Sequence, residues 1–270
     1  MPPSPERRRF SRILLRLVLL AALVASGAYW AKRQVDFRDF AANDFALSSA
    51  RVQERLKERI EDHNTVLHAI HGLFNSSERV TPAEFARFVA SLQLERHYPG
   101  IDGLTYTRRV PADARERFEA RMRARHGEDF RIFPETGRDV HYVITRMAPR
   151  ERNRGALGFD IASERNRRKT ANRARDTGRL ALSGPVRLIT PGGTRLDILA
   201  LAPVYRTAEA PATVAGRREA LRGWVSAGYN VQAVLDDFMH RLGDPHVRLE
   251  LFAGGGTDAQ IGRASCRERV

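Results

Sequence analysis

Residues 155–188 read GALGFDIASERNRRKTANRARDTGRLALSGPVRL and predict a strand, a helix and a second strand. The middle part, from Ser163 as the expected N-cap, is arginine-rich and free of proline, and Gly178 follows it where a left-handed glycine often ends a helix. The apolar runs on either side predict the strands. Such a unit brings the strand ends near Asp160 and Leu182 together, so we expect both residues to face one pocket.

Asp160 stands between the first strand and the helix. A carboxylate in this place can cap the helix by accepting backbone N–H groups, or it can accept hydrogen bonds from an amine or amidine ligand. Capping is the commoner use, and the residues alone leave both roles open.

The rest of the chain alternates strands and helices in the same way. A capping box, Thr81 with Glu84, and Pro82 at the first helical position predict a helix start. The pattern predicts helices at 81–92, 111–127, 163–178 and 230–242, and strands at 104–110, 130–133, 140–148, 155–161, 186–190, 196–205, 223–229 and 247–253. The fold class expected is α+β, with a long helical lead and antiparallel sheets.

Residues 13–31, ILLRLVLLAALVASGAYWA, are apolar except for one arginine and predict a transmembrane helix. Tyr29 and Trp30 at its end are typical of a membrane interface, and arginines before it place residues 1–12 in the cytoplasm. The alternative is a cleaved signal peptide, with ALVASGA as the small-residue cleavage region. Both interpretations place the bulk of the chain in the periplasm. With a retained anchor, we expect the membrane to be a partner of the chain.

Residues 32–74 predict a stalk helix. Apolar residues and one histidine recur at alternating steps of four and three, namely Leu56, Ile60, His63, Leu67, Ile70 and Phe74. This seam packs either within its own domain or against a second copy in a homodimer. His63, His68 and His71 lack the Glu-x-x-His pattern of helical metal sites, so we expect surface histidines rather than a metal centre.

Charge and motifs exclude several function classes. The net charge is +14, but only three of the 46 basic residues are lysines and the arginines are scattered, which is unlike a nucleic-acid-binding arm. The chain contains neither G-x-S-x-G nor Gly-Lys-Ser/Thr, so we expect no enzyme activity, no cofactor and no nucleic-acid partner. The absence of a nucleophile motif argues against a secreted hydrolase.

Six motifs in order resemble the CHASE domain, the extracytoplasmic sensor of bacterial and plant receptors that include the cytokinin-receptor histidine kinases. The resemblance covers about residues 75–240 and rests on YPGIDGLTYTRRVP, RERFE, YVITRMAP, ALGFDIASERNRR, RARDTGRLALSGPVRL and LALAPVY. It implies a stalk helix followed by tandem PAS-like antiparallel-sheet subdomains in a sensor region of 75–260. The membrane-distal part would be about 80–190 and the membrane-proximal part about 191–260.

The resemblance also implies a ligand site and a signalling role. The positions that match Asp160, Leu182 and Thr177 contact or shape the pocket for an adenine-like ligand in the cytokinin receptors, and Tyr142 and Ile144 are the expected lining. We therefore expect a small-molecule sensor of a histidine kinase or diguanylate cyclase, dimeric through its stalk. A periplasmic binding or scaffold module without signalling output is the alternative.

The end of the chain departs from the resemblance. Residues 261–270, IGRASCRERV, are basic and polar, and they resemble translated sequencing-adaptor sequence. We expect this segment to be non-native and the chain to stop before its output module.

Overall fold

The structure is a computed structural model that describes residues 5–77, 79–127, 129–190, 193–207, 209–243, 248–252 and 260–265. The chain divides into two compact units, Met1–Lys57 and Glu58–Val270. The second unit holds every strand of the described residues and is the part that positions a site.

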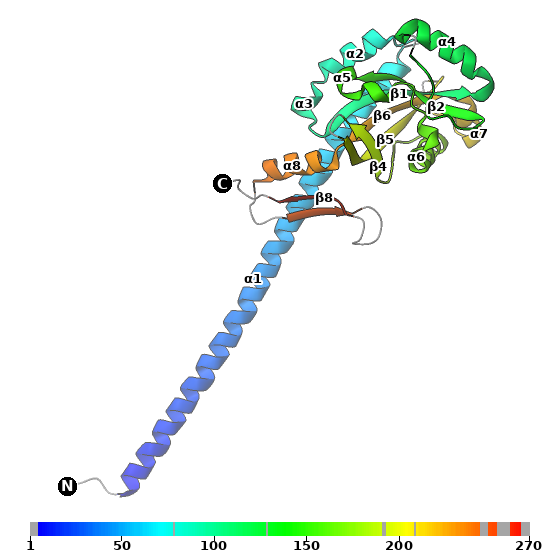
Figure 1. Cartoon of the computed structure of the whole chain (residues 1–270). Coiled ribbons are helices and arrows are strands. Elements are labelled where there is room, and N and C mark those ends of the chain that lie inside the picture. The colour runs from blue at the N-terminus through cyan, green and yellow to red at the C-terminus, as the bar shows by residue number, and fades with distance from the viewer. Residues whose placement is uncertain are drawn as a thin grey trace. The chain divides into compact units, whose positions relative to one another are not determined.

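Helix α1, Pro5–Asn75, covers both the predicted transmembrane segment and the predicted stalk (Figure 1). Among the described residues, no helix has the length and apolar character of a candidate membrane span. The side chains of residues 13 to 18, at the start of the predicted span, lie outside the described part of the chain.

The central feature of the second unit is an antiparallel sheet with the strand order β2-β1-β6-β5-β3. A sixth strand, β4, pairs only with β5, and a separate hairpin joins β7 to β8. The strands are β1 Ile101–Pro111, β2 Val140–Ala148, β3 Ala181–Leu182, β4 Val186–Thr190, β5 Gly193–Tyr205, β6 Leu221–Tyr229, β7 Arg248–Phe252 and β8 Gln260–Ser265.

Helices are placed on both faces and at the ends of this sheet (Figure 1). After α1 they are α2 Pro82–Ser91, α3 Leu94–His97, α4 Arg115–His126, α5 Arg150–Asn153, α6 Arg165–Thr177, α7 Val214–Ala220 and α8 Val231–Leu242. Three short 3-10 turns complete the list, η1 Ala112–Ala114, η2 Arg154–Ala156 and η3 Ile161–Ser163.

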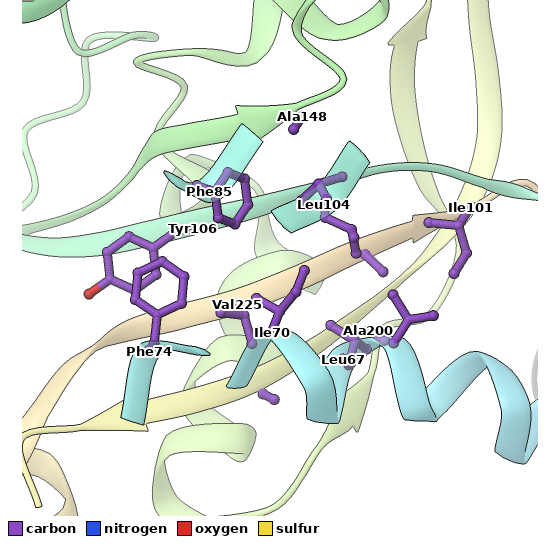
Figure 2. Close-up of a cluster of buried hydrophobic side chains, with 14 of the residues drawn as sticks. Leu67, Ile70, Phe74, Phe85, Ile101, Leu104, Tyr106, Ala148, Ala200 and Val225 are labelled. Atoms are coloured by element: carbon purple, nitrogen blue, oxygen red, sulfur yellow. The ribbon is translucent and has the colours of Figure 1, made fainter. Parts of the chain in front are cut away.

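The last turns of α1 form one core with the sheet. Leu67, Ile70 and Phe74 are buried against residues of β1, β5 and β6, and Phe85 of α2 joins them (Figure 2). Each such side chain contributes about 1.5–3 kcal/mol on burial. Of the two alternatives for the seam, these contacts support packing within the domain for its C-terminal half, whereas Ile60, nearer the N-terminus, is 49% exposed.

A second core lies between β2, β5 and β6 and helix α6. Trp224 of β6 is fully buried there, and its indole Nε1 donates a 2.9 Å hydrogen bond to the carbonyl oxygen of Ala171 in α6. Ala171 and Ala174 are also fully buried, which lets the helix approach the sheet closely. The arginine-rich helix is therefore held by small residues on one face, while Arg165 and Arg173 on other faces are exposed.

Most elements expected from the pattern are present. Strands at 140–148 and 186–190 have the predicted bounds, and the Thr81–Glu84 capping box is confirmed by hydrogen bonds of 3.2 and 2.7 Å. Gly178 has φ 71° and ends α6 as predicted. Glu84 accepts from the Thr81 backbone, and this hydrogen bond holds the pKa of its carboxyl below the usual value.

Three local predictions are wrong. Residues 130–133 and 155–161 form no strand; each contributes only isolated bridges, Phe133 with Phe159 and Val143 with Asp160. The N-cap of α6 is Glu164 rather than Ser163, because its carboxylate accepts from the backbone N–H groups of Asn166 and Arg167, both at 2.8 Å.

The predicted division of the sensor region near residue 190 falls inside the β4–β5 hairpin. The strands β5 and β6 that follow it pair with β1 and β3, which come before it. The sheet therefore supplies no boundary at that point. Residues 266–270 of the predicted non-native tail lie outside the described residues, and 260–265 form β8.

Candidate functional site

The carboxylate of Asp160 is completely buried and fully occupied by the protein itself. Its Oδ1 accepts from the backbone N–H of Tyr142 at 2.8 Å and of Ala162 at 2.9 Å, and its Oδ2 lies 2.8 Å from Nδ1 of His141. His141 is also buried. Asp160 thus caps η3 and joins it to β2, whereas the helix that the sequence offered for capping, α6, is capped by Glu164.

The segment before Asp160 runs along the outer edge of β2. The carbonyl oxygen of Phe159 accepts from the N–H of Ile144 at 3.0 Å, and the N–H of Gly158 donates to the carbonyl of Ile144 at 2.9 Å. Gly158 has φ 89°, and a Cβ there would lie 2.2 Å from the carbonyl oxygen of Arg131. Only glycine fits both the conformation and the space.

Tyr142 and Ile144 lie together in the second core. The Tyr142 ring packs at 4.4 Å from the Trp224 ring, and its hydroxyl donates to Oδ1 of Asn172 in α6 at 2.7 Å. Burial raises the pKa of the Tyr142 hydroxyl above its usual value, so the group is neutral at physiological pH. These two predicted site residues and Asp160 therefore meet in the structure.

Leu182 and Thr177 lie at the surface, at the far end of α6. Leu182 is 46% exposed, and its carbonyl oxygen accepts a hydrogen bond from the guanidinium of Arg173. The hydroxyl of Thr177 donates to the carbonyl of the same Arg173 at 2.8 Å. Arg173 is the shared neighbour of these two predicted site residues, and sequence reasoning missed it because it stands among many arginines.

A carboxylate with two arginine partners sits beside this end of α6. Asp176 forms hydrogen bonds with Arg218 at 2.7 and 2.9 Å and with Arg175 at 2.6 and 3.2 Å. The bonds from Arg218 and then Arg175 hold the pKa of Asp176 well below its usual value. The hydroxyl of Tyr205 donates to the carbonyl of Arg175 at 2.6 Å, which fixes this group to β5.

The histidines of α1 bind the backbone of their own domain. The ring of His63 is buried and lies within hydrogen-bond distance of the carbonyls of Arg59 and Pro99, so the expectation of a surface position is wrong for it. His71 is half-buried and contacts the carbonyl of Pro203 at 2.9 Å, while His68 is exposed. Within the described residues, no three His, Cys, Asp or Glu side chains converge as a metal site would require.

Comparison with protein families places this architecture. The family model of the CHASE domain matches residues 78–261, which is more than half of the chain. The chain belongs to the CHASE domain family. The CHASE domain is an extracellular sensor domain of receptors, so the match assigns this region to sensing rather than to catalysis.

Two curated relatives contain the same region within much longer chains. "Probable histidine kinase 6" of Oryza sativa subsp. japonica is 26% identical over 163 residues, covering 58% of this chain and 16% of that protein. "Probable histidine kinase 4" of the same organism is 25% identical over 250 residues, covering 87% of this chain and 24% of that protein. The chain thus spans about a quarter or less of the length of these relatives.

A solved structure resembles this CHASE domain distantly. The ligand-binding domain of the Pseudomonas aeruginosa amino acid chemoreceptor PctC, in complex with GABA, aligns with a TM-score of 0.41 at 12% identity. The alignment covers 78% of this chain and 69% of that one.

Proposed function

We propose that this chain is the extracytoplasmic ligand-sensing part of a membrane receptor of the histidine kinase or diguanylate cyclase type. The observation that carries the proposal is the CHASE family match over residues 78–261, the region that contains the whole six-stranded sheet. The names of the two plant relatives, which describe them as probable histidine kinases, support a kinase output.

The packing of α1 on the sheet supports a route for the signal. Leu67, Ile70 and Phe74 share one core with β1, β5 and β6, so a change in the curvature or spacing of the sheet alters their packing directly. A ligand that binds one arrangement of the sheet better than another would shift the position of α1 in the same sense. Pairing of the exposed part of α1 in a homodimer, and anchoring through residues 13–31, complete the proposal.

For the ligand site we propose the α6 side of the sheet, with Asp160, Leu182, Thr177, Tyr142 and Ile144. Asp160 accepts a hydrogen bond from the backbone of Tyr142, and Tyr142 and Ile144 share one core, whereas Leu182 and Thr177 are exposed toward the other end of α6. Because the Asp160 carboxylate is closed off by three internal hydrogen bonds, direct contact with a ligand requires η3 to move away from β2. Asp160 would then act as a polar anchor for an adenine-like or other small organic ligand.

Thermal unfolding of the full chain tests this proposal. The chain is screened against adenine and other purines, amino acids and small organic acids; a ligand present at 100 times its Kd stabilises the folded state by about 2.7 kcal/mol. A binding ligand should lose its effect in Asp160→Ala and weaken in Thr177→Ala, each compared with its own ligand-free midpoint. The matched control is Asp139→Ala, an exposed aspartate directly before β2.

If a ligand raises the unfolding temperature of Asp160→Ala and Thr177→Ala as much as that of the wild type, neither residue belongs to the site. The sensor role itself has a separate test, the sequence of the gene beyond codon 260. A second apolar span followed by a kinase or cyclase supports the receptor, whereas a stop codon in the natural gene supports a binding module without output.

A further inference from the structure

A cavity lies on the opposite side of β2 from the predicted site. It has a volume of about 680 Å³ and opens between helices α2 and α3 and the C-terminal end of β2 with α5. Its size suits a small organic ligand, because ligand cavities span about 300–1,000 Å³. None of the five predicted site residues lines it.

The inner wall of this cavity is apolar. Phe85, Val89 and Leu94 from α2 and α3 and Met147 from β2 are all buried, and all line the cavity. The exposed faces of α2 that border it carry alanines rather than larger side chains. The cavity therefore offers an apolar surface against which the apolar body of a ligand can be removed from water.

One cation in the wall lacks an anionic partner. Arg146, on β2, is half-buried, and its guanidinium carbon lies 5.9 Å from the centre of the Phe74 ring and 5.3 Å from that of Tyr106. The centres of these two rings are 4.2 Å apart, and the rings lie against each other (Figure 2). Both faces attract the guanidinium through cation–π contacts. Its Nε is buried and donates to no acceptor, and Arg146 forms no ion pair with a carboxylate of the described residues.

The charges around Arg146 reinforce its need for an anion. Burial lowers its pKa, and the nearby Arg108, Arg125 and Arg222 lower it further, although a guanidinium remains charged at neutral pH. His126 in the same wall has its pKa lowered by burial and then by neighbouring arginines, of which Arg146 is one. A partly desolvated cation among other cations is costly unless an anion joins it.

Carboxylates at the mouth of the cavity do not fill this role. Glu95 and Glu151 line it from α3 and α5, but both are exposed and neither forms an ion pair with Arg146. Arg96 and Arg150 line the same mouth, so the side chains there bring two positive charges along with the two negative ones and supply no net negative charge to offset Arg146.

We propose that this cavity binds a small organic anion, a carboxylate with an alkyl or aromatic body. Arg146 donates charge-assisted hydrogen bonds to the carboxylate, and the apolar body lies against Phe85, Val89 and Met147. The site is separate from the one proposed on the α6 side, and it goes beyond the sensing function assigned there.

Isothermal titration of the full chain with hexanoate and benzoate tests the proposal, with hexanamide and benzamide as uncharged ligands of the same shape. The carboxylates should bind at least about tenfold more tightly than the amides, since a charge-assisted hydrogen bond is about twice as strong as a neutral one. Arg146→Gln should abolish this preference. Arg117→Gln, which removes an exposed arginine of α4 away from the cavity, should leave it unchanged.

A second variant keeps the proposal testable if Arg146→Gln unfolds. Ala90→Phe places a ring in the cavity from α2 and leaves the residue at 146 as arginine, and it should abolish binding of carboxylates and amides alike. Equal affinity for the acid and the amide overturns the proposal, and so does binding that survives Ala90→Phe. The absence of carboxylate binding at about 10 mM ligand also overturns it, because a specific site should bind more tightly than that. Loss of binding in Asp160→Ala with Ala90→Phe unaffected would assign the ligand to the α6 side instead.

Discussion

Replacing Asp160 tests whether its main role is to hold the fold. In Asp160→Ala the backbone N–H groups of Tyr142 and Ala162 lose their acceptor in a fully buried place, and His141 loses its partner. A buried donor left without an acceptor costs about 1–3 kcal/mol. The two backbone groups together with the imidazole predict a loss of about 3–5 kcal/mol in the free energy of unfolding.

Asp160→Asn separates the two oxygens of the carboxylate. An amide oxygen in the place of Oδ1 still accepts from Tyr142 and Ala162, and only the contact with His141 changes from acceptor to donor. The expected loss is about 1–2 kcal/mol, because a single pair is mismatched and the imidazole can change its tautomer. The three hydrogen bonds therefore predict that the free energy of unfolding decreases in the order wild type, Asp160→Asn, Asp160→Ala.

Denaturant unfolding at pH 7 and 25 °C, followed by circular dichroism and by the fluorescence of the buried Trp224, measures these differences. Asp139→Ala is the matched control and should change the free energy of unfolding by less than about 0.5 kcal/mol, since its side chain is exposed. An Asp160→Ala variant within 1 kcal/mol of wild type (about the cost of one lost hydrogen bond) would refute the reasoning. A larger loss for Asn than for Ala would refute the assignment of the oxygens.

Two further variants test other parts of the site. Gly158→Ala should lower the free energy of unfolding by more than about 2 kcal/mol, because its Cβ meets the carbonyl oxygen of Arg131 at a positive φ, whereas Gly155→Ala, with nothing within 4 Å, should change little; equal effects in denaturant unfolding would contradict the geometry. Asp176→Asn removes a carboxylate whose pKa is lowered in the folded state by Arg218 and Arg175, so its stabilisation is present above pH 4 and is lost as the pH falls through the folded-state pKa. Because the Arg218 side chain is 57% exposed, the free energy of unfolding of the wild type should exceed that of Asp176→Asn by about 1 kcal/mol or less at pH 7. If thermal unfolding showed this difference growing below pH 4, the assignment would be contradicted.

The sequence predicts the elements that carry a regular pattern and a terminal signal. The capping box at Thr81 and the glycine at 178 mark helix ends by chemistry that is local, so these ends are found correctly. The alternating apolar residues of 140–148 mark β2 in the same way. Local signals contain no information on strand order, so the pairing of β6 with both β1 and β5 is not visible before the fold is known.

The site shows the same limit. Residues 155–161 are apolar enough to predict a strand, but the positive φ of Gly158 and the turn at Asp160 exclude one. The choice between cap and ligand for Asp160 depends on Tyr142 and His141, which are eighteen and nineteen positions away. In the sequence Arg146 resembles an ordinary polar position of an alternating strand. Its place over the rings of Phe74 and Tyr106, without a carboxylate partner among the described residues, depends on two other elements and becomes visible only in the fold.

The covering of β2 by residues 158–160 has a consequence for the behaviour of the protein at high concentration. β2 lies at one edge of the sheet, and an exposed edge strand is a template on which other chains can add strands and aggregate. The N–H groups of Tyr142 and Ile144 already donate to Asp160 and Phe159, and the carbonyl of Ile144 already accepts from Gly158. Displacement of this segment would expose an edge strand with unpaired backbone groups. Opening at Asp160 would therefore give a ligand access and would also favour self-association.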